Sequence, residues 1–295
     1  MDPLVIAFGL GVGILVGLTG IGGGSLMTPL LLIFIGTNPV VAVGTDIAYG
    51  AITKTLGGWR HWRNGSVDVG VSKWLAFGSV PGSVIGVLLI SYLHHHHADA
   101  FDTTLLWIVA GTLAVTAVIT LARALFMPKL VARERHTVKL GPRGRTAAVT
   151  LGATLGFILG VTSVGSGALI GLALILVFRL TPHRVVGTDV FHAAILLWAA
   201  GLAHLALGNI DFGLMGTILI GSLPGVLIGE HLSRRIPAAA LRPALGCVML
   251  GSALGVMSKA GANLSAWVII GPPVLVGVFA YGLQRSRVRG VVAAA

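Results

Sequence analysis

Glycines interrupt a long apolar segment near the start of the chain. The stretch 17–25 reads GLTGIGGGS and lies inside an apolar run from Leu4 to Ile35. Glycine at this density breaks a helix, because it loses the most backbone entropy on folding. The flanks are nevertheless apolar enough to lie in a bilayer, where irregular backbone is tolerated only if protein buries it or it lines a cavity. The remainder of the chain must therefore enclose this break.

Composition places the chain in a membrane. Of its 295 residues, 55% are hydrophobic and only 10% are charged, and the mean hydropathy is +0.95. A soluble domain carries about 25% charged residues. The apolar runs are continuous and several approach the roughly 20 residues that span a bilayer as a helix. We predict an all-α, multi-pass integral membrane protein of the cell inner membrane.

Charge and cysteine content exclude other classes of partner. The chain has 20 Lys and Arg against 9 Asp and Glu, and the basic residues lie in short loops between apolar runs. That pattern reports orientation in a membrane rather than a nucleic-acid partner. Cys247 is the single cysteine, so there is no intrachain disulfide, and we predict neither a metal site nor a cofactor. Asp2 and the lack of a basic region ahead of the first run indicate that this run is not a cleaved signal peptide.

The glycine-rich stretch occurs twice. Residues 9–86 align without a gap on residues 152–229, with 26 identities in 78 positions at an offset of 143. Shared glycine and leucine richness would explain scattered matches, but polar and proline positions match as well. Gly44-Thr45-Asp46 aligns with Gly187-Thr188-Asp189. This internal duplication predicts two structural halves in one membrane domain.

The halves divide the chain into three parts. We predict a first membrane repeat at 1–126, a basic cytoplasmic linker at 127–146, and a second membrane repeat with an extra C-terminal helix at 147–295. A polar turn is expected at His94–His97. If all basic loops lie inside, the segment 147–178 must enter and leave on the same side as a re-entrant pair of half-helices. The two repeats are then inverted relative to each other, as in many secondary transporters.

The combined motifs resemble a known family. The glycine-rich GLTGIGGGS followed by Pro29, the downstream VGTD, and the weaker second copy are similar to the sulfite exporter TauE/SafE family. The resemblance covers almost the whole chain. It implies transport of a small sulfur-containing anion such as sulfite, sulfoacetate or another organosulfonate, and no enzyme activity.

The two breaks are the predicted anion site. A half-helix that begins inside the membrane directs free N–H groups and a positive dipole end into the protein, which favours an anion. Hydroxyl groups at the breaks add donors without adding charge. Close helix packing alone is the alternative explanation. The candidate binding residues are Thr19, Gly20, Gly22, Gly23, Gly24, Ser25, Thr162, Ser163, Gly165, Ser166 and Gly167.

Two aspartates are candidates for ion coupling. Asn38-Pro39 and Thr181-Pro182 each read as a helix N-cap followed by proline, which places Asp46 and Asp189 about seven residues into their helices. Carboxylates within a membrane segment are rare and usually serve proton or ion coupling. The alternative is that the helices begin later and the aspartates cap them.

Three further residues lie in the same runs. Lys54 could bind the anion or extend towards the interface near Arg60. Tyr49 and its repeat counterpart His192 follow the aspartates by one turn, and His192 could carry a proton. A histidine packed between helices is the simpler interpretation.

The sequence therefore predicts a secondary transporter of a small anion, held at mid-membrane between the two breaks. A coupling proton or cation is expected, and a homo-oligomer is left open. The alternatives are an anion channel with the same lining and a non-transporting subunit of a membrane complex.

Overall fold

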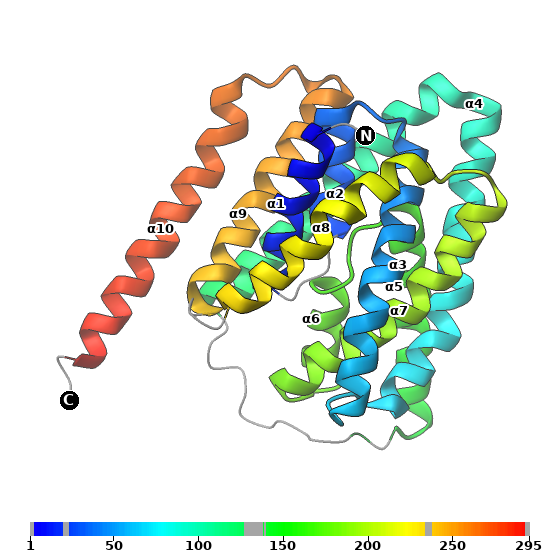
Figure 1. Cartoon of the computed structure of the whole chain (residues 1–295). Coiled ribbons are helices and arrows are strands. Elements are labelled where there is room, and N and C mark those ends of the chain that lie inside the picture. The colour runs from blue at the N-terminus through cyan, green and yellow to red at the C-terminus, as the bar shows by residue number, and fades with distance from the viewer. Residues whose placement is uncertain (1–2, 20–23, 127–137, 139, 234–237, 293–295) are drawn as a thin grey trace.

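The computed structural model describes residues 3–19, 24–126, 138, 140–233 and 238–292 (Figure 1). Every regular element in these residues is helical. The first half holds α1 (Pro3–Thr19), α2 (Gly24–Leu30), the π-helical η1 (Leu31–Ile35), α3 (Pro39–Arg63) and α4 (Val69–Phe126). The second holds α5 (Pro142–Thr162), α6 (Leu169–Leu176), α7 (Pro182–Ala206), α8 (Phe212–Ser233), α9 (Ala238–Met257), η2 (Ser258–Ala262) and α10 (Ala266–Val292).

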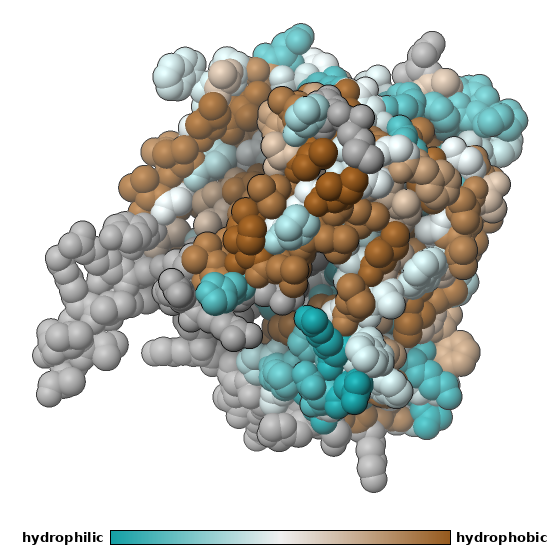
Figure 2. All heavy atoms as spheres, in the orientation of Figure 1, coloured by the Kyte–Doolittle hydropathy of each residue, from teal (hydrophilic) through white to brown (hydrophobic). Residues whose placement is uncertain are grey.

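The predicted membrane class is confirmed. Six helical segments in the described residues are long and apolar enough to cross a bilayer: 69–98, 100–125, 142–162, 182–206, 212–229 and 243–262. Large apolar side chains such as Leu227, which is 63% exposed, face outward. Figure 2 shows an apolar band across the visible face of the molecule, with hydrophilic residues gathered above and below it. This surface suits a lipid environment rather than water.

The turn expected at His94–His97 coincides with a break in α4. Helical geometry is lost at His97, with φ −143° and ψ 42°, between the two spans 69–98 and 100–125. Two histidines make local bonds there: His96 Nδ1 lies 2.8 Å from the Tyr92 carbonyl oxygen, and His94 Nδ1 lies 2.8 Å from Asp102 Oδ1. The two spans of α4 therefore meet at a sharp kink of polar residues rather than at an extended loop.

Glycines outside the two breaks bring helices into close contact. A Cβ atom at Gly13 would lie 2.3 Å from the carbonyl oxygen of Ser222, so α1 and α8 touch through their backbones. The contact between α5 and α4 is equivalent, since a Cβ at Gly156 would lie 2.3 Å from the Ser79 carbonyl oxygen. Only residues without a Cβ allow this approach. Each half thus packs its first helix on a helix of the other half.

Helices α3 and α7 pass each other in opposite directions at the centre. Thr45, near the start of α3, accepts a hydrogen bond from the backbone N–H of Asp211, which follows α7, at 3.0 Å. Thr188, near the start of α7, accepts one from the backbone N–H of Asp68, which follows α3, at 2.8 Å. Figure 1 shows the same arrangement, in which the colour gradients of the two helices run in opposite senses.

Candidate functional site

The second glycine-rich stretch separates two helices. Helix α5 ends at Thr162 and α6 begins at Leu169. The backbone between them takes left-handed values at Ser163 (φ 59°), Gly165 (φ 127°) and Gly167 (φ 94°). Glycine adopts such angles at little cost, whereas a side chain strains them. The break therefore depends on the glycines at 165 and 167.

The first stretch is described only at its edges. Helix α1 ends at Thr19 and α2 begins at Gly24, while Ser25 is buried. Gly20, Gly22 and Gly23 lie outside the described residues. Their proposed part in anion binding remains a prediction.

Asp46 lies in the protein interior, where Oδ2 accepts two hydroxyl groups. Helix α3 begins at Pro39, and the Asn38 side chain accepts the Val40 N–H at 3.0 Å, so the alternative that Asp46 caps the helix is wrong. Asp46 is 1% exposed. Its Oδ2 accepts from Thr28 Oγ1 at 2.5 Å and from Ser163 Oγ at 2.8 Å. The carboxylate therefore joins α3 to α2 and to the second break.

Lys54 and Asp189 also face the second break. The buried Lys54 ammonium donates to Ser166 Oγ at 2.9 Å, and so does not extend to the interface. Asp189 is likewise buried, and its Oδ1 accepts the backbone N–H of Gly167 at 3.2 Å. Helix α7 begins at Pro182, so Asp189 lies inside it rather than at its cap. Three charged side chains thus converge on residues 163–167.

Tyr49, His192 and Thr162 lie beside this cluster in different roles. His192 is buried and its Nε2 lies 3.1 Å from Ser79 Oγ, so this histidine joins α7 to α4. Tyr49 is fully buried. The Thr162 hydroxyl bonds the Ile158 carbonyl at 2.7 Å and accepts the Val164 N–H at 3.2 Å, and therefore stabilises the end of α5.

The Gly-Thr-Asp motifs position both aspartates. A Cβ at Gly44 would lie 2.2 Å from the Asn209 carbonyl oxygen, and one at Gly187 would lie 2.5 Å from Ser66 Oγ. Each glycine thus lets the turn of the other half approach. Thr45 and Thr188 accept the backbone N–H groups of Asp211 and Asp68, respectively. Asp46 and Asp189, the next residues, project into the interior. The aspartates that follow the turns cap the next helices. Asp68 accepts the Val71 N–H at 3.0 Å, and Asp211 accepts the Leu214 N–H at 2.9 Å.

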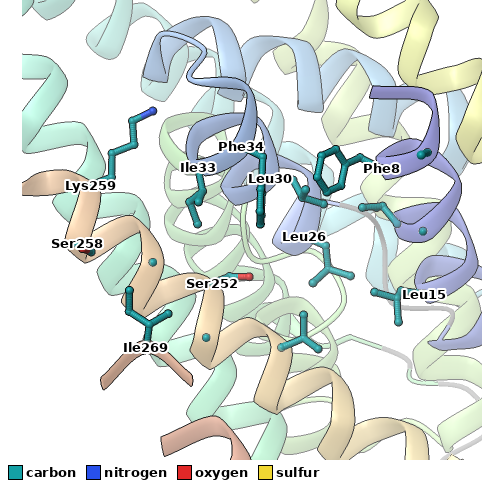
Figure 3. A pocket seen from close by; sticks show the side chains of 16 residues that line it. Phe8, Leu15, Leu26, Leu30, Ile33, Phe34, Ser252, Ser258, Lys259 and Ile269 are labelled. Atoms are coloured by element: carbon teal, nitrogen blue, oxygen red, sulfur yellow. The ribbon is translucent and has the colours of Figure 1, made fainter. Parts of the chain in front are cut away.

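Two apolar grooves lie away from this cluster. One of about 780 Å³ lies between α1, α2 and η1 on one side and α9 and α10 on the other (Figure 3). Phe8, Leu26 and Phe34 line it, and the Lys259 ammonium at its margin donates to the Leu32 carbonyl. A second, of about 520 Å³, lies between α4 and α7. Neither contains a candidate binding residue, and both suit acyl chains better than an anion.

Thr28, Ser79 and Arg123 belong to the surroundings of the cluster but are absent from the predicted set. Thr28 follows Ser25 by three residues and so shares its helix face, which is a signal in the sequence. Arg123, at the end of α4, interacts with Asp189. No sequence pattern links Arg123 to the glycine-rich breaks, because it comes near them only through the change of direction of α4 at His97.

Comparison with known proteins identifies the family. The family model described as "Sulfite exporter TauE/SafE" matches residues 5–256. The chain belongs to the TauE/SafE family. This confirms the resemblance, and it makes the chain a membrane transporter by family. The match ends before α10, so the extra C-terminal helix lies outside it.

Relatives of this TauE/SafE protein carry only general names. The Bacillus subtilis protein "Probable membrane transporter protein YjnA" is 38% identical over 256 residues, covering 86% of this chain and 99% of its own length. YdhB of the same species, with the same description, is 26% identical over 233 residues, 79% of this chain and 91% of its own. A "Probable membrane transporter protein" of Xylella fastidiosa is 26% identical over 278 residues, 90% and 99% of the two chains. No solved structure matches significantly.

Proposed function

We propose that this TauE/SafE protein is a secondary transporter of a small sulfur-containing anion such as sulfite, sulfoacetate or another organosulfonate, and has no enzyme activity. The observation that carries the proposal is the buried Lys54 ammonium bonded to Ser166 of the second break. A lysine buried in a membrane protein is costly unless it is paired, and usually marks a substrate or ion path. A small anion is the complementary ligand.

The anion site is proposed between 19–25 and 162–168. The Gly167 N–H and the Ser166 hydroxyl lie at the start of α6, where free N–H groups and the positive end of the helix dipole favour an anion. The Gly167 N–H bonds Asp189, and the Ser166 hydroxyl bonds Lys54. The incoming anion would replace Asp189 as acceptor of the Gly167 N–H.

The two halves are proposed to be inverted repeats that alternate access to this site. Supporting this, α3 and α7 are antiparallel and exchange equivalent threonine contacts. Helix α6 has 8 residues, about 12 Å at 1.5 Å per residue, which is too short to cross a core of about 30 Å. Helix α5, with 21 residues, is by contrast long enough to cross, so only α6 would be a half-helix of the segment 147–178 that we propose to be re-entrant. Rocking of one half against the other would move the site between faces.

Coupling is assigned to the buried polar residues around the site, namely Asp46, Asp189, Tyr49 and His192. The two carboxylates can hold a proton or a cation that travels with the anion. His192 bridges α7 and α4 and would transmit movement between them.

A ligand panel on the purified protein tests the function. Sulfite, sulfoacetate and other sulfonates, compared with chloride and sulfate, should raise the melting temperature selectively, because a ligand stabilises the state that it binds. Lys54→Gln should abolish that shift. Lys73→Gln is the matched control, since Lys73 is exposed at the start of α4. An unchanged rise in melting temperature in Lys54→Gln would mean that the anion binds elsewhere.

A transport assay separates the alternatives. Reconstituted protein should accumulate the anion against its gradient. Passive flux alone would indicate a channel, and no flux would indicate a non-transporting subunit.

A further inference from the structure

The two buried carboxylates have unequal surroundings. Asp46 Oδ2 accepts two hydroxyl hydrogens, from Thr28 and Ser163, as an ionised carboxylate oxygen does. Its Oδ1 is buried and has no hydrogen-bond partner among the described residues. A buried polar oxygen without a partner is costly, and more so when it carries charge. This oxygen is therefore open to a ligand.

Positive groups gather on the other carboxylate. Lys54 bonds Ser166, the residue next to the Gly167 N–H that Asp189 accepts. Arg123 and the Gly167 N–H also act on Asp189. The two aspartates occupy equivalent repeat positions, but at the positions equivalent to Thr28 and Ser163 the other half has Gly171 and Gly20, which lack hydroxyls. The two repeats have thus diverged. Cationic groups surround Asp189 on one side, and the hydroxyl oxygens of Thr28 and Ser163 surround Asp46 on the other, oxygen-rich side.

The oxygen-rich side lies at the negative end of a helix. Ser163 is the C-cap residue of α5, whose last carbonyl groups have no partner within the helix. A hydroxyl that donates its hydrogen to a carboxylate keeps its lone pairs available. Thr28 and Ser163 therefore keep oxygen lone pairs available beside the Asp46 carboxylate. Unwound backbone carbonyls and helix C-terminal ends are the features that coordinate Na⁺ in transporters with broken helices.

We infer that Asp46, Thr28 and Ser163 form a binding site for a small monovalent cation, Na⁺, which is carried together with the anion at Lys54 and Ser166. The inference rests on the proposed function and separates the roles of its two carboxylates. One carboxylate among hydroxyls suits a monovalent ion, whereas divalent ions usually recruit several carboxylates.

Binding can be tested without any transported anion. The melting temperature of the purified protein is measured in sodium chloride, potassium chloride and choline chloride at equal ionic strength. We expect a saturable rise with sodium alone, amounting to RT ln(1 + [Na⁺]/Kd) in unfolding free energy. Asp46→Asn should abolish the rise, and Thr28→Val, which keeps the side-chain shape, should weaken it at least tenfold in Kd. An equal response to all three salts, or a full response in Asp46→Asn, would overturn the inference.

The matched controls separate this site from the anion site. Asp189→Asn should keep the sodium response, because Asp189 lacks the hydroxyl partners. Lys54→Gln should keep the sodium response and lose the anion response. If sodium has no effect while the sulfonate response persists, the cation site is wrong and the proposed function stands. A sodium response without any sulfonate response would support the cation site and refute the anion site.

Discussion

At the scale of single residues, the second break depends on one glycine more than on its polar neighbours. Gly165 has φ 127°, and a Cβ there would lie 3.0 Å from Leu169 Cδ1. The carbonyl of Gly165 also accepts the Leu169 N–H at 3.1 Å, which begins α6. Any side chain at 165 would therefore move the start of α6 and with it the Ser166 hydroxyl and the Gly167 N–H.

Gly165→Val should abolish the anion-induced rise in melting temperature while the protein still inserts and purifies. Valine is β-branched and poorly tolerates a positive φ. Ser166→Ala provides the graded comparison, since it removes one hydrogen-bonding group and should weaken binding by about 1 kcal/mol. A wild-type response in Gly165→Val would mean that the break serves packing alone. The repeat-equivalent Gly22→Val carries the same expectation, although Gly22 lies outside the described residues.

At the scale of elements, glycines decide which helices can touch. Helix α1 carries glycines on two faces. Gly13 faces the backbone of α8, whereas a Cβ at Gly11 would meet nothing within 4 Å. The same residue type in the same helix thus has a packing role at one position and none at the other. The contact between α1 of the first half and α8 of the second half depends on glycines that face the other helix, such as Gly13.

Gly13→Ala should destabilise the protein by about 1–3 kcal/mol, because the added methyl group would lie 2.3 Å from the Ser222 carbonyl oxygen and force α1 from α8. Gly11→Ala is the control in the same helix. It should be neutral or slightly stabilising, since alanine favours a helix by about 1 kcal/mol over glycine. Thermal unfolding of both variants in one detergent gives the comparison. Equal losses would mean that the glycines act through backbone entropy rather than through contact.

At the scale of the whole molecule, both ends of the bundle are polar but only one collects arginines. The end of α3 carries Arg60 and Arg63, and the start of α5 carries Arg143 and Arg145. Arg63 and Arg145 each lie 5.1 Å from a tryptophan ring, those of Trp59 and Trp74. An excess of arginine is typical of the cytoplasmic face, whereas tryptophan is enriched at both membrane interfaces. The opposite end carries His94–His97.

Single cysteines in a Cys247→Ser background should define the orientation. We expect His95→Cys to react with an impermeant thiol reagent in intact cells, and Arg143→Cys to react only after the cells are opened. Both positions are exposed, so access depends on the side of the membrane. The reverse labelling would invert the orientation, and labelling of both in intact cells would contradict a span between them.

The sequence by itself determined the membrane class and the internal duplication. These follow from continuous apolar length and from the repeated order of glycine, polar and proline positions, which are read along the chain without knowledge of the fold. The resemblance to the TauE/SafE family likewise rests on motifs that are local in sequence. Such features need no partner from a distant segment to be recognised.

Only the tertiary structure decided which polar groups meet. The sequence left Asp46 between cap and interior, and left Lys54 between cavity and interface. The structure places Asp46 against Thr28 and Ser163, and Lys54 against Ser166, 112 residues away. The kink at His97 returns α4 along the bundle, and it brings Arg123 towards Asp189. These pairings arise because a buried charge takes whichever partner the packed helices bring within reach, and a periodic pattern records the face of a helix but not its neighbour.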